Sequence, residues 1–208
     1  MRAIFKDGLV VLVPEEAQER AELAQWKATH AGHAFAMRTD EGESAEFHDL
    51  GPQADACREP INVISNSPDA AIRPIGNFAP TPFDLEGVRY ASVESFWQGL
   101  KFPEGSKRRR IAALEGGRAR SEGEAQGYGA SISYGGQEIA VGTWAHWQLM
   151  EQACRAKFSQ NEEARAALLA TGERPLVHVV RRDSKAIPGV IMADIWMRIR
   201  AELRSQAG

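Results

Sequence analysis

Apolar runs broken by turn-forming residues open the chain in the pattern of a small α/β segment. Two apolar runs over residues 3–13 flank Asp7-Gly8, a dipeptide that readily supplies the positive backbone angles of a tight turn, so they predict a β-hairpin. Pro14 and the acidic residues after it predict the start of a helix, and the stretches HAFAMR and AEFHDLG follow as short strands. Residues 1–57 therefore predict a small N-terminal α/β extension.

Residues 58–208 have apolar positions that recur mainly with a helical period. Trp147, Met150, Cys154 and Phe158 are three or four residues apart, which predicts a helix that packs one face against a core. Short β-prone stretches stand between the helical ones. The pattern predicts a mainly α domain of the α+β class, with a helical core, short strands and hairpins.

Capping residues and glycines mark the ends of the expected elements. Ser92 is expected to cap a helix that runs through SVESFWQGLKF to Pro103, because its hydroxyl can accept from the first free N–H groups. Gly116-Gly117 is expected to close the next, basic helix, and Gly135-Gly136 to turn a second β-hairpin.

Length, composition and charge are those of a soluble globular protein. The 208 residues suffice for one domain of ordinary size with a small extension, and the net charge of -3 does not indicate a dedicated nucleic-acid binder. No apolar run approaches the roughly 18 residues that span a bilayer, and no secretion signal is evident, so we expect a cytoplasmic protein without a membrane partner. Cys57 and Cys154 lack the spacing and neighbouring histidines of a zinc site, and we expect no metal.

The helix expected after Ser92 carries the candidate chemistry. Glu94, Trp97, Gln98 and Lys101 fall at i, i+3, i+4 and i+7 and therefore share one face. Such a face could border a pocket, or it could be a solvated stripe with an ordinary Glu–Lys pair and a Trp that fills space. Periodicity alone does not decide between the two.

Two segments resemble the signatures of the NADAR/YbiA-like family. The first is INVIS...IGNFAPTPFDLEGVRYASVESFWQGLKF, and the second is LMEQACRAKFSQNEEARAALLATGERPLV; together they lie within residues 61–200, about two thirds of the chain. The family positions matched in the first segment are Asn77-Phe78, Ser92, Glu94, Gln98 and Lys101-Phe102. The resemblance implies a YbiA-like helical core for residues 58–208.

The resemblance also implies an activity. Members of the family cleave N-glycosidic bonds to ribose, so the expected function is an N-glycosidase that removes ADP-ribose from a modified base such as ADP-ribosylated guanine, or acts on a related ribosyl phosphate. The substrate could then be part of a nucleic acid. The alternatives are an N-glycosidase for riboflavin-pathway intermediates and a non-catalytic module that binds ADP-ribose or another nucleotide. No cofactor is implied, and the oligomeric state is left open.

Three residues are the catalytic candidates that this activity suggests. Loss of a base leaves positive charge on the ribose, so the Glu94 carboxylate could stabilise that charge and orient or deprotonate water. Asp183 lies where the family usually has an aspartate and could assist, or it could be a turn residue. Lys101 could hold a phosphate or a ribose hydroxyl, or act as an amine nucleophile.

Six residues are the candidates for substrate binding. The amides of Asn77 and Gln98 suit sugar hydroxyls and base edges, and aromatic rings can stack on a base. Arg118 belongs to a basic patch, beginning at Lys107, that could meet phosphates or lie solvated on a helix. The full set is Asn77, Phe78, Trp97, Gln98, Trp144 and Arg118.

The resemblance is incomplete after Asp183. The family's usual Trp-Gly is replaced there by residues 184–189, and Val190 and Met192-Ala193 stand where the family has Asn and Leu-Gly. These differences indicate a divergent subfamily, and Trp144 could replace the lost stacking surface.

Overall fold

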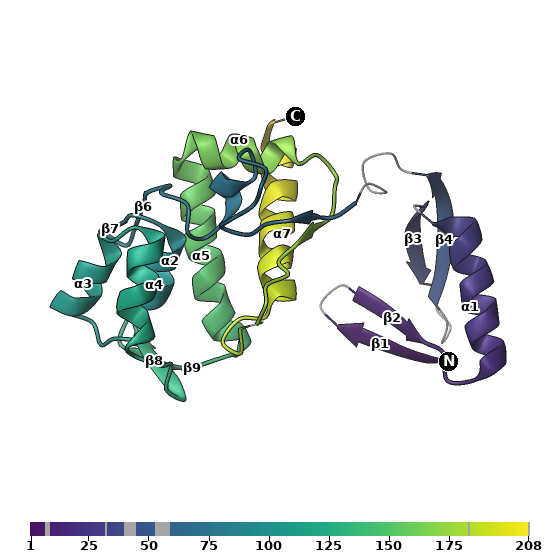
Figure 1. Ribbon diagram of the computed structural model, residues 1–208, viewed down its shortest axis with the longest axis horizontal. Helices are drawn as coiled ribbons and strands as arrows, with labels where there is room; N and C mark the ends of the chain where they lie inside the picture. Colours follow the sequence, from purple (N-terminus) through teal and green to yellow (C-terminus); the bar gives the residue numbers. More distant parts are fainter. Residues whose placement is uncertain (7–8, 32, 40–44, 53–58, 183, 208) are drawn as a thin grey trace. The chain divides into compact units, whose positions relative to one another are not determined.

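The computed structural model describes residues 1–6, 9–31, 33–39, 45–52, 59–182 and 184–207. The chain divides into two compact units, Met1–Glu59 and Pro60–Gly208 (Figure 1). Within the described residues, no helix is both long and apolar enough to cross a membrane.

The first unit consists of two antiparallel strand pairs and one helix. Strands β1 (Arg2–Lys6) and β2 (Leu9–Val13) form the first pair, helix α1 (Ala17–His30) follows, and β3 (His33–Thr39) and β4 (Ala45–Pro52) form the second pair. The predicted hairpin and helix are thus confirmed, whereas the turn at Asp7-Gly8 lies outside the described residues. The helix begins with a capping box in which the side chains of Glu16 and Glu19 each accept from the other's backbone.

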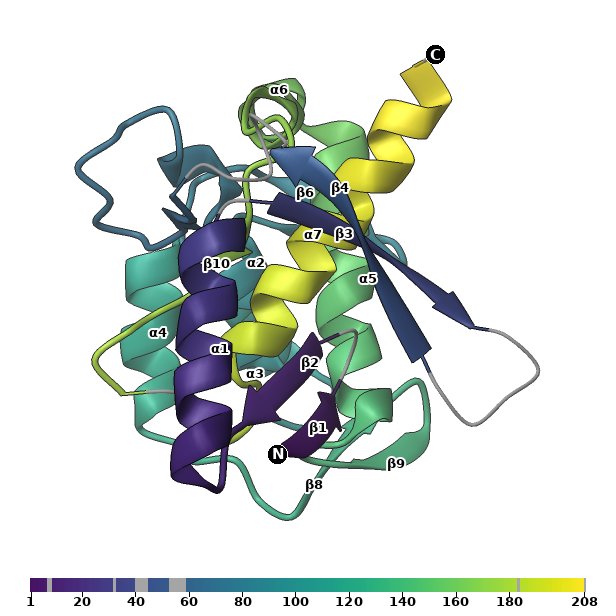
Figure 2. The same ribbon diagram turned by 90° about the vertical axis from the view of Figure 1, so that its right-hand side faces the viewer.

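The second unit is a group of helices with short strands between them, which confirms the α+β class. Its helices are α2 (Val93–Gly99), α3 (Ser106–Ala112), α4 (Gly116–Glu124), α5 (Trp144–Gln160), α6 (Glu162–Ala170) and α7 (Gly189–Ala207), and a short 3-10 turn η1 spans Arg73–Ile75. Its strands are β5 (Ile61–Asn62), β6 (Phe83–Leu85), β7 (Val88–Tyr90), β8 (Ser131–Tyr134), β9 (Gln137–Ala140) and β10 (Leu176–Val177). In the part that the structure describes, each sheet has two strands, so helix packing forms the body of this unit (Figures 1 and 2).

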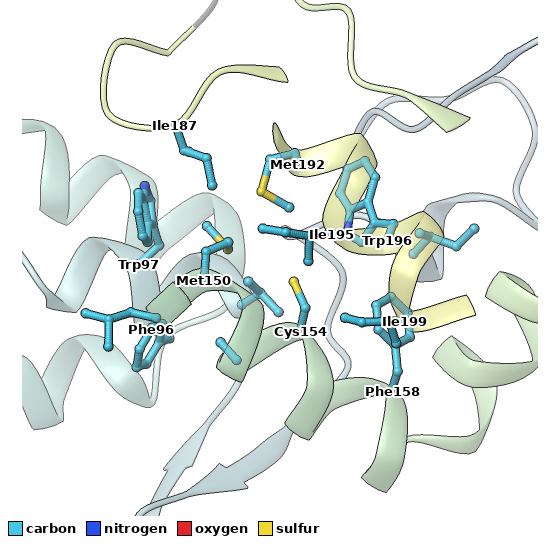
Figure 3. Packing of buried hydrophobic residues seen from close by; sticks show 14 of the residues in the cluster. Phe96, Trp97, Met150, Cys154, Phe158, Ile187, Met192, Ile195, Trp196 and Ile199 are labelled. Carbon is cyan, nitrogen blue, oxygen red and sulfur yellow. The ribbon is translucent and has the colours of Figure 1, made fainter. Parts of the chain in front are cut away.

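Helices α5 and α7 lie side by side and supply the centre of the core (Figure 3). Of the apolar stripe predicted on α5, Met150, Cys154 and Phe158 are at most 1% exposed, and Trp147 is half-buried against the same core. From α7, Met192 and Trp196 close over them. Burying side chains of this size stabilises the fold by roughly 1.5–3 kcal/mol each.

A parallel strand pair brings the two ends of the second unit together. Ile61 of β5 pairs with Leu176 of β10, and the His178 ring hydrogen-bonds the carbonyl of Val63 at 2.7 Å. Because parallel strands run in the same direction, the loops that leave them emerge at the same edge. The segment after β10 therefore lies beside the segment after β5, although 115 residues separate them along the chain.

Two expectations from the sequence are wrong in this unit. Gly116-Gly117 does not close a helix; α3 already ends at Ala112, and the glycines begin α4. A Cβ atom on Gly116 would lie 2.5 Å from the Cα of Phe78, so glycine is needed there for close packing. Helix α2 is also shorter than expected, because it ends at Gly99 rather than continuing to Pro103.

Candidate active site

Helix α2 is held at its N-terminus by reciprocal caps and by the loop before it. The Ser92 hydroxyl accepts from the N–H of Ser95, and the Ser95 hydroxyl accepts from the N–H of Ser92, each at 3.1 Å. The Glu94 N–H donates to the carbonyl of Asn77 at 2.9 Å. These bonds satisfy the free N–H groups of a buried helix start and fix Glu94 beside the Asn77 loop.

Glu94 lies at the wall of a cavity of about 710 Å³. Its side chain is buried, with the whole residue only 4% exposed, so the face that carries it is not a solvated stripe. The cavity is formed by the segments after β5 and β10, the Asn77 loop, and helices α2, α4, α5 and α7. Of the candidates predicted from the sequence, it brings together Asn77, Phe78, Glu94 and Trp97.

The electrostatic environment of Glu94 combines burial with two nearby cations. Burial raises the pKa of the Glu94 carboxyl, while a hydrogen bond from Gln98 and the charges of Arg120 and Lys101 oppose that rise. The Gln98 Nε2 atom donates to Oε1 of Glu94 at 2.6 Å, and Nη1 of Arg120 lies 3.7 Å from the same oxygen. The second carboxylate oxygen makes no hydrogen bond to the described residues, so it is available to a ligand or water.

The Asn77 side chain has no oxygen or nitrogen partner within the part of the chain that the structure describes. Among the described residues, its Nδ2 atom donates only to sulfur atoms, at 4.0 Å from Met150 Sδ and 3.7 Å from Met192 Sδ. Its buried Oδ1 has no hydrogen-bond partner within the described part of the chain. Buried amides are normally satisfied, and the exceptions call for a specific cause. A ligand with donor and acceptor groups would satisfy this amide.

Lys101 faces a different hollow from Glu94. Its Nζ donates to the carbonyl of Gly123 at 3.0 Å and lies 5.2 Å from the Tyr128 ring centroid. Burial lowers the pKa of Lys101, and the nearby Arg120 lowers it further. The hollow that Lys101 lines has a volume of about 490 Å³ and shares Trp97, Arg120 and Ser184 with the larger cavity.

Trp97 has both of the roles left open by the sequence. It is buried and stacks on His146 with ring centroids 4.3 Å apart, so it fills the core. It also lines both hollows.

The remaining predicted residues lie elsewhere. Trp144 is 53% exposed, its ring lies 6.0 Å from the Arg198 guanidinium carbon, and it lines neither hollow. Arg118 is exposed on α4 and also lines neither hollow. Asp183 lies outside the described residues.

Three arginines of the described residues line the larger cavity; Arg120 belongs to the basic patch that the sequence indicated, whereas Arg181 and Arg182 were not singled out. Arg120 lines both hollows, and Arg181 and Arg182 line the larger one. Arg120 lies four residues after Gly116 on α4, so the two residues share one face of that helix. The sequence did not indicate this face, because α4 was not expected. No local pattern indicates Arg181 and Arg182, because only the β5–β10 pairing brings their segment to the cavity.

Part of the predicted basic patch is engaged in contacts within the protein. Arg108 is buried and donates to the carbonyls of Phe102 and Ser133. Arg110 pairs with Glu122 at 2.7 Å. The charge left for phosphates on this side is therefore smaller than the sequence indicates.

Comparison with known proteins identifies the family. A family model described as bacteriophage protein GP30.3 matches residues 71–198, which is more than half of the chain. The chain belongs to this family. Its fold is also similar to that of the Escherichia coli protein YbiA, whose NMR structure matches with a TM-score of 0.52 and 26% identity over 71% of this chain and 86% of that one. No curated protein matches the chain. The likeness to YbiA confirms the expected YbiA-like fold of the GP30.3 family member, and the site residues remain predictions.

Proposed function

We propose that this protein is an N-glycosidase that hydrolyses the bond between a base and the ribose of an ADP-ribosyl or ribosyl-phosphate group. ADP-ribosylated guanine, free or within a nucleic acid, is the first candidate substrate. The observation that carries the proposal is the buried Glu94 carboxylate, which lines a cavity large enough for a nucleotide.

The proposed chemistry begins with charge that develops on the sugar. As the bond to the base lengthens, the ribose becomes cationic, and a carboxylate in a shielded site stabilises that cation more strongly than water does. Glu94 meets this need because one oxygen is held by Gln98 and the other has no hydrogen-bond partner among the described residues. The free oxygen can accept a proton from the attacking water. Asp183 remains the candidate for a second carboxylate.

The arginines of the cavity support an anionic substrate. The described lining includes three guanidinium groups, from Arg120, Arg181 and Arg182, and a single carboxylate, that of Glu94. Neither Arg181 nor Arg182 pairs with a carboxylate among the described residues. Guanidinium groups bind phosphate oxygens through paired, charge-assisted hydrogen bonds. A diphosphate near these side chains would leave the attached ribose within the cavity.

The unsatisfied Asn77 amide supports recognition of a sugar or a base. Its two ends can donate and accept at once, as hydroxyl groups and base edges require. Phe78 lines the same cavity and offers an aromatic surface beside it. Lys101 lines the smaller hollow and would contact the part of a substrate that lies there.

A product assay tests the proposal. The purified protein is incubated with DNA that carries ADP-ribosylated guanine and with phosphoribosyl pyrimidine intermediates of riboflavin synthesis, and release of ADP-ribose or base is measured. Glu94→Gln keeps the side-chain shape and is expected to lower kcat at least about 100-fold. Glu122→Gln, at an exposed carboxylate, serves as the matched control.

Two results would contradict the proposal. If the wild-type protein leaves every substrate intact but binds ADP-ribose, the protein is a nucleotide-binding module rather than an enzyme. If Glu94→Gln retains full turnover, Glu94 is not the acting carboxylate. Cleavage of the riboflavin intermediates alone would support the glycosidase and exclude ADP-ribosyl substrates.

A further inference from the structure

Gln98 directs its amide nitrogen at the candidate catalytic carboxylate. It lies one helical turn after Glu94, and its Nε2 donates to Oε1 of Glu94 at 2.6 Å. A carboxylate can only accept, so the NH₂ end of the amide must face Glu94 and the oxygen must face away. Gln98 borders the smaller hollow but is only 1% exposed.

The oxygen of Gln98 fits against a glycine of the neighbouring helix. Its Oε1 is buried and has no hydrogen-bond partner within the described ranges. A Cβ atom on Gly123 of α4 would lie 2.0 Å from this Oε1, 2.8 Å from Cδ and 2.9 Å from Cβ of Gln98. All three distances are too short for real contacts. Gly123 has no positive φ, so a glycine is needed there for space and not for backbone conformation.

Both ends of α4 are fixed at the site. The carbonyl of Gly123 accepts from Lys101 at 3.0 Å, which ties this end of α4 to the segment after α2. At the other end, Gly116 packs against the backbone of Phe78. Helix α4 therefore cannot move away freely to make room for a side chain at position 123.

We infer that Gln98 and Gly123 form a positioning pair, in which the missing side chain of Gly123 lets the Gln98 amide orient the Glu94 carboxylate without touching the substrate. The inference rests on the proposed function of Glu94. It differs from the expectation that Gln98 binds substrate, because the Gln98 nitrogen is used by Glu94 and its oxygen is enclosed by α4.

The charged and titratable groups around Glu94 determine how its pKa would change if Gln98 no longer oriented the carboxylate. Arg120 of α4 and Lys101 after α2 favour the charged carboxylate, and Tyr128, before β8, senses the Glu94 charge. Burial favours the neutral acid. Removing the Gln98 donor leaves the burial in place, so the Glu94 titration midpoint should move upward.

The test compares two glycine substitutions on the same helix. Gly123→Ala places a methyl group against Gln98, whereas a Cβ on Gly117 has nothing within 4 Å. Both changes raise helix propensity equally. The Glu94 carboxyl is titrated by NMR with ¹³C-labelled glutamate, and its signal is assigned by its loss in Glu94→Gln. We expect the midpoint to rise in Gly123→Ala and to stay at the wild-type value in Gly117→Ala.

Two further variants show whether the effect passes through Gln98. Gln98→Met keeps the length of the side chain and removes the donor, so it should raise the midpoint even if Gly123→Ala fails to fold. Gln98→Ala removes Oε1 and Cδ and leaves only the Cβ contact at 2.9 Å, so adding Gly123→Ala to it should cause a much smaller further shift than in the wild type. In turnover assays, Gly123→Ala should lower kcat about 100-fold with little change in KM, since a misplaced catalytic group affects the transition state.

The titration needs no turnover and therefore separates the two proposals. If wild-type protein cleaves nothing but Gly123→Ala and Gln98→Met still move the midpoint, the positioning pair stands and the enzymatic proposal fails. If turnover depends on Glu94 but Gln98→Met leaves both the midpoint and kcat unchanged, the positioning pair is refuted. A Gly123→Ala shift that persists in full without the Gln98 side chain also refutes it.

Discussion

Lys157 is a fully buried amine whose removal should change how stability depends on pH. It lies on α5 next to Phe158, and its Nζ donates to the carbonyls of Ile75 and Gly76 at 3.0 and 2.8 Å. Burial lowers the pKa of Lys157 to about 7 from its ordinary value of 10.5. The amine also secures the backbone just before Asn77, so the same bonds support the cavity.

The folded and unfolded states bind different numbers of protons at Lys157, and this difference sets the direction in which stability changes with pH. Between pH 7 and about 10.5, the unfolded chain keeps the Lys157 proton while the folded protein loses it, so stability rises with pH through this range. With these two pKa values, the gain between pH 7 and pH 9 is about 2 kcal/mol. Cys154 acts in the opposite direction, because its thiol pKa is raised to about 12 by burial and an unfolded thiol ionises above about pH 9.

The assay is urea unfolding of the wild type and Lys157→Met at pH 7, 8 and 9. Methionine fills similar space without a charge, so the slope due to residue 157 should vanish while the other titrations remain. The unfolding free energy of the wild type minus that of Lys157→Met should therefore increase by about 2 kcal/mol from pH 7 to pH 9. Parallel curves would mean that the two carbonyls hold the proton against burial, and would refute the reasoning.

Two further predictions concern α4. Gly116→Ala should lower the unfolding free energy by about 1–3 kcal/mol in thermal or urea unfolding, because its methyl group meets the backbone of Phe78, which cannot rotate away; an unchanged stability would show that the loop yields. Arg120→Gln should weaken the binding of ADP-ribose about 10-fold in calorimetry, since it removes a charged donor from the cavity. Arg118→Gln, two residues away on the exposed side, should bind as the wild type does, and equal losses in both variants would contradict a specific role for Arg120.

The elements that local sequence determines were predicted correctly. Ser92 caps α2 and Gly135-Gly136 turns the second hairpin with positive φ angles, both as expected. Each of these signals acts within a few residues, so no distant contact is needed to interpret it.

The elements that depend on distant contacts were missed. Helix α4 contains three glycines in nine residues, which disfavour a helix by propensity alone. Its helical form depends on close packing, with Gly116 against Phe78 and Gly123 against Gln98. The hairpin of β6 and β7 was also overlooked, because its turn places a non-glycine residue, Glu86, at a φ of 51°.

The polar stripe on α2 shows why a helical face does not by itself define a site. The sequence places Glu94 and Lys101 on one face, about 10 Å apart along an ideal helix. Because α2 ends at Gly99, the chain turns before Lys101, and its amine reaches the end of α4 instead of the cavity that Glu94 lines. Gln98, between them, is covered by Gly123. The packing of α4 thus places three neighbouring polar side chains differently. Glu94 faces the cavity, Gln98 is covered by Gly123, and Lys101 faces the smaller hollow. A mechanism that requires Glu94 and Lys101 to act on the same sugar atom would need the substrate to occupy both hollows, which share Trp97, Arg120 and Ser184.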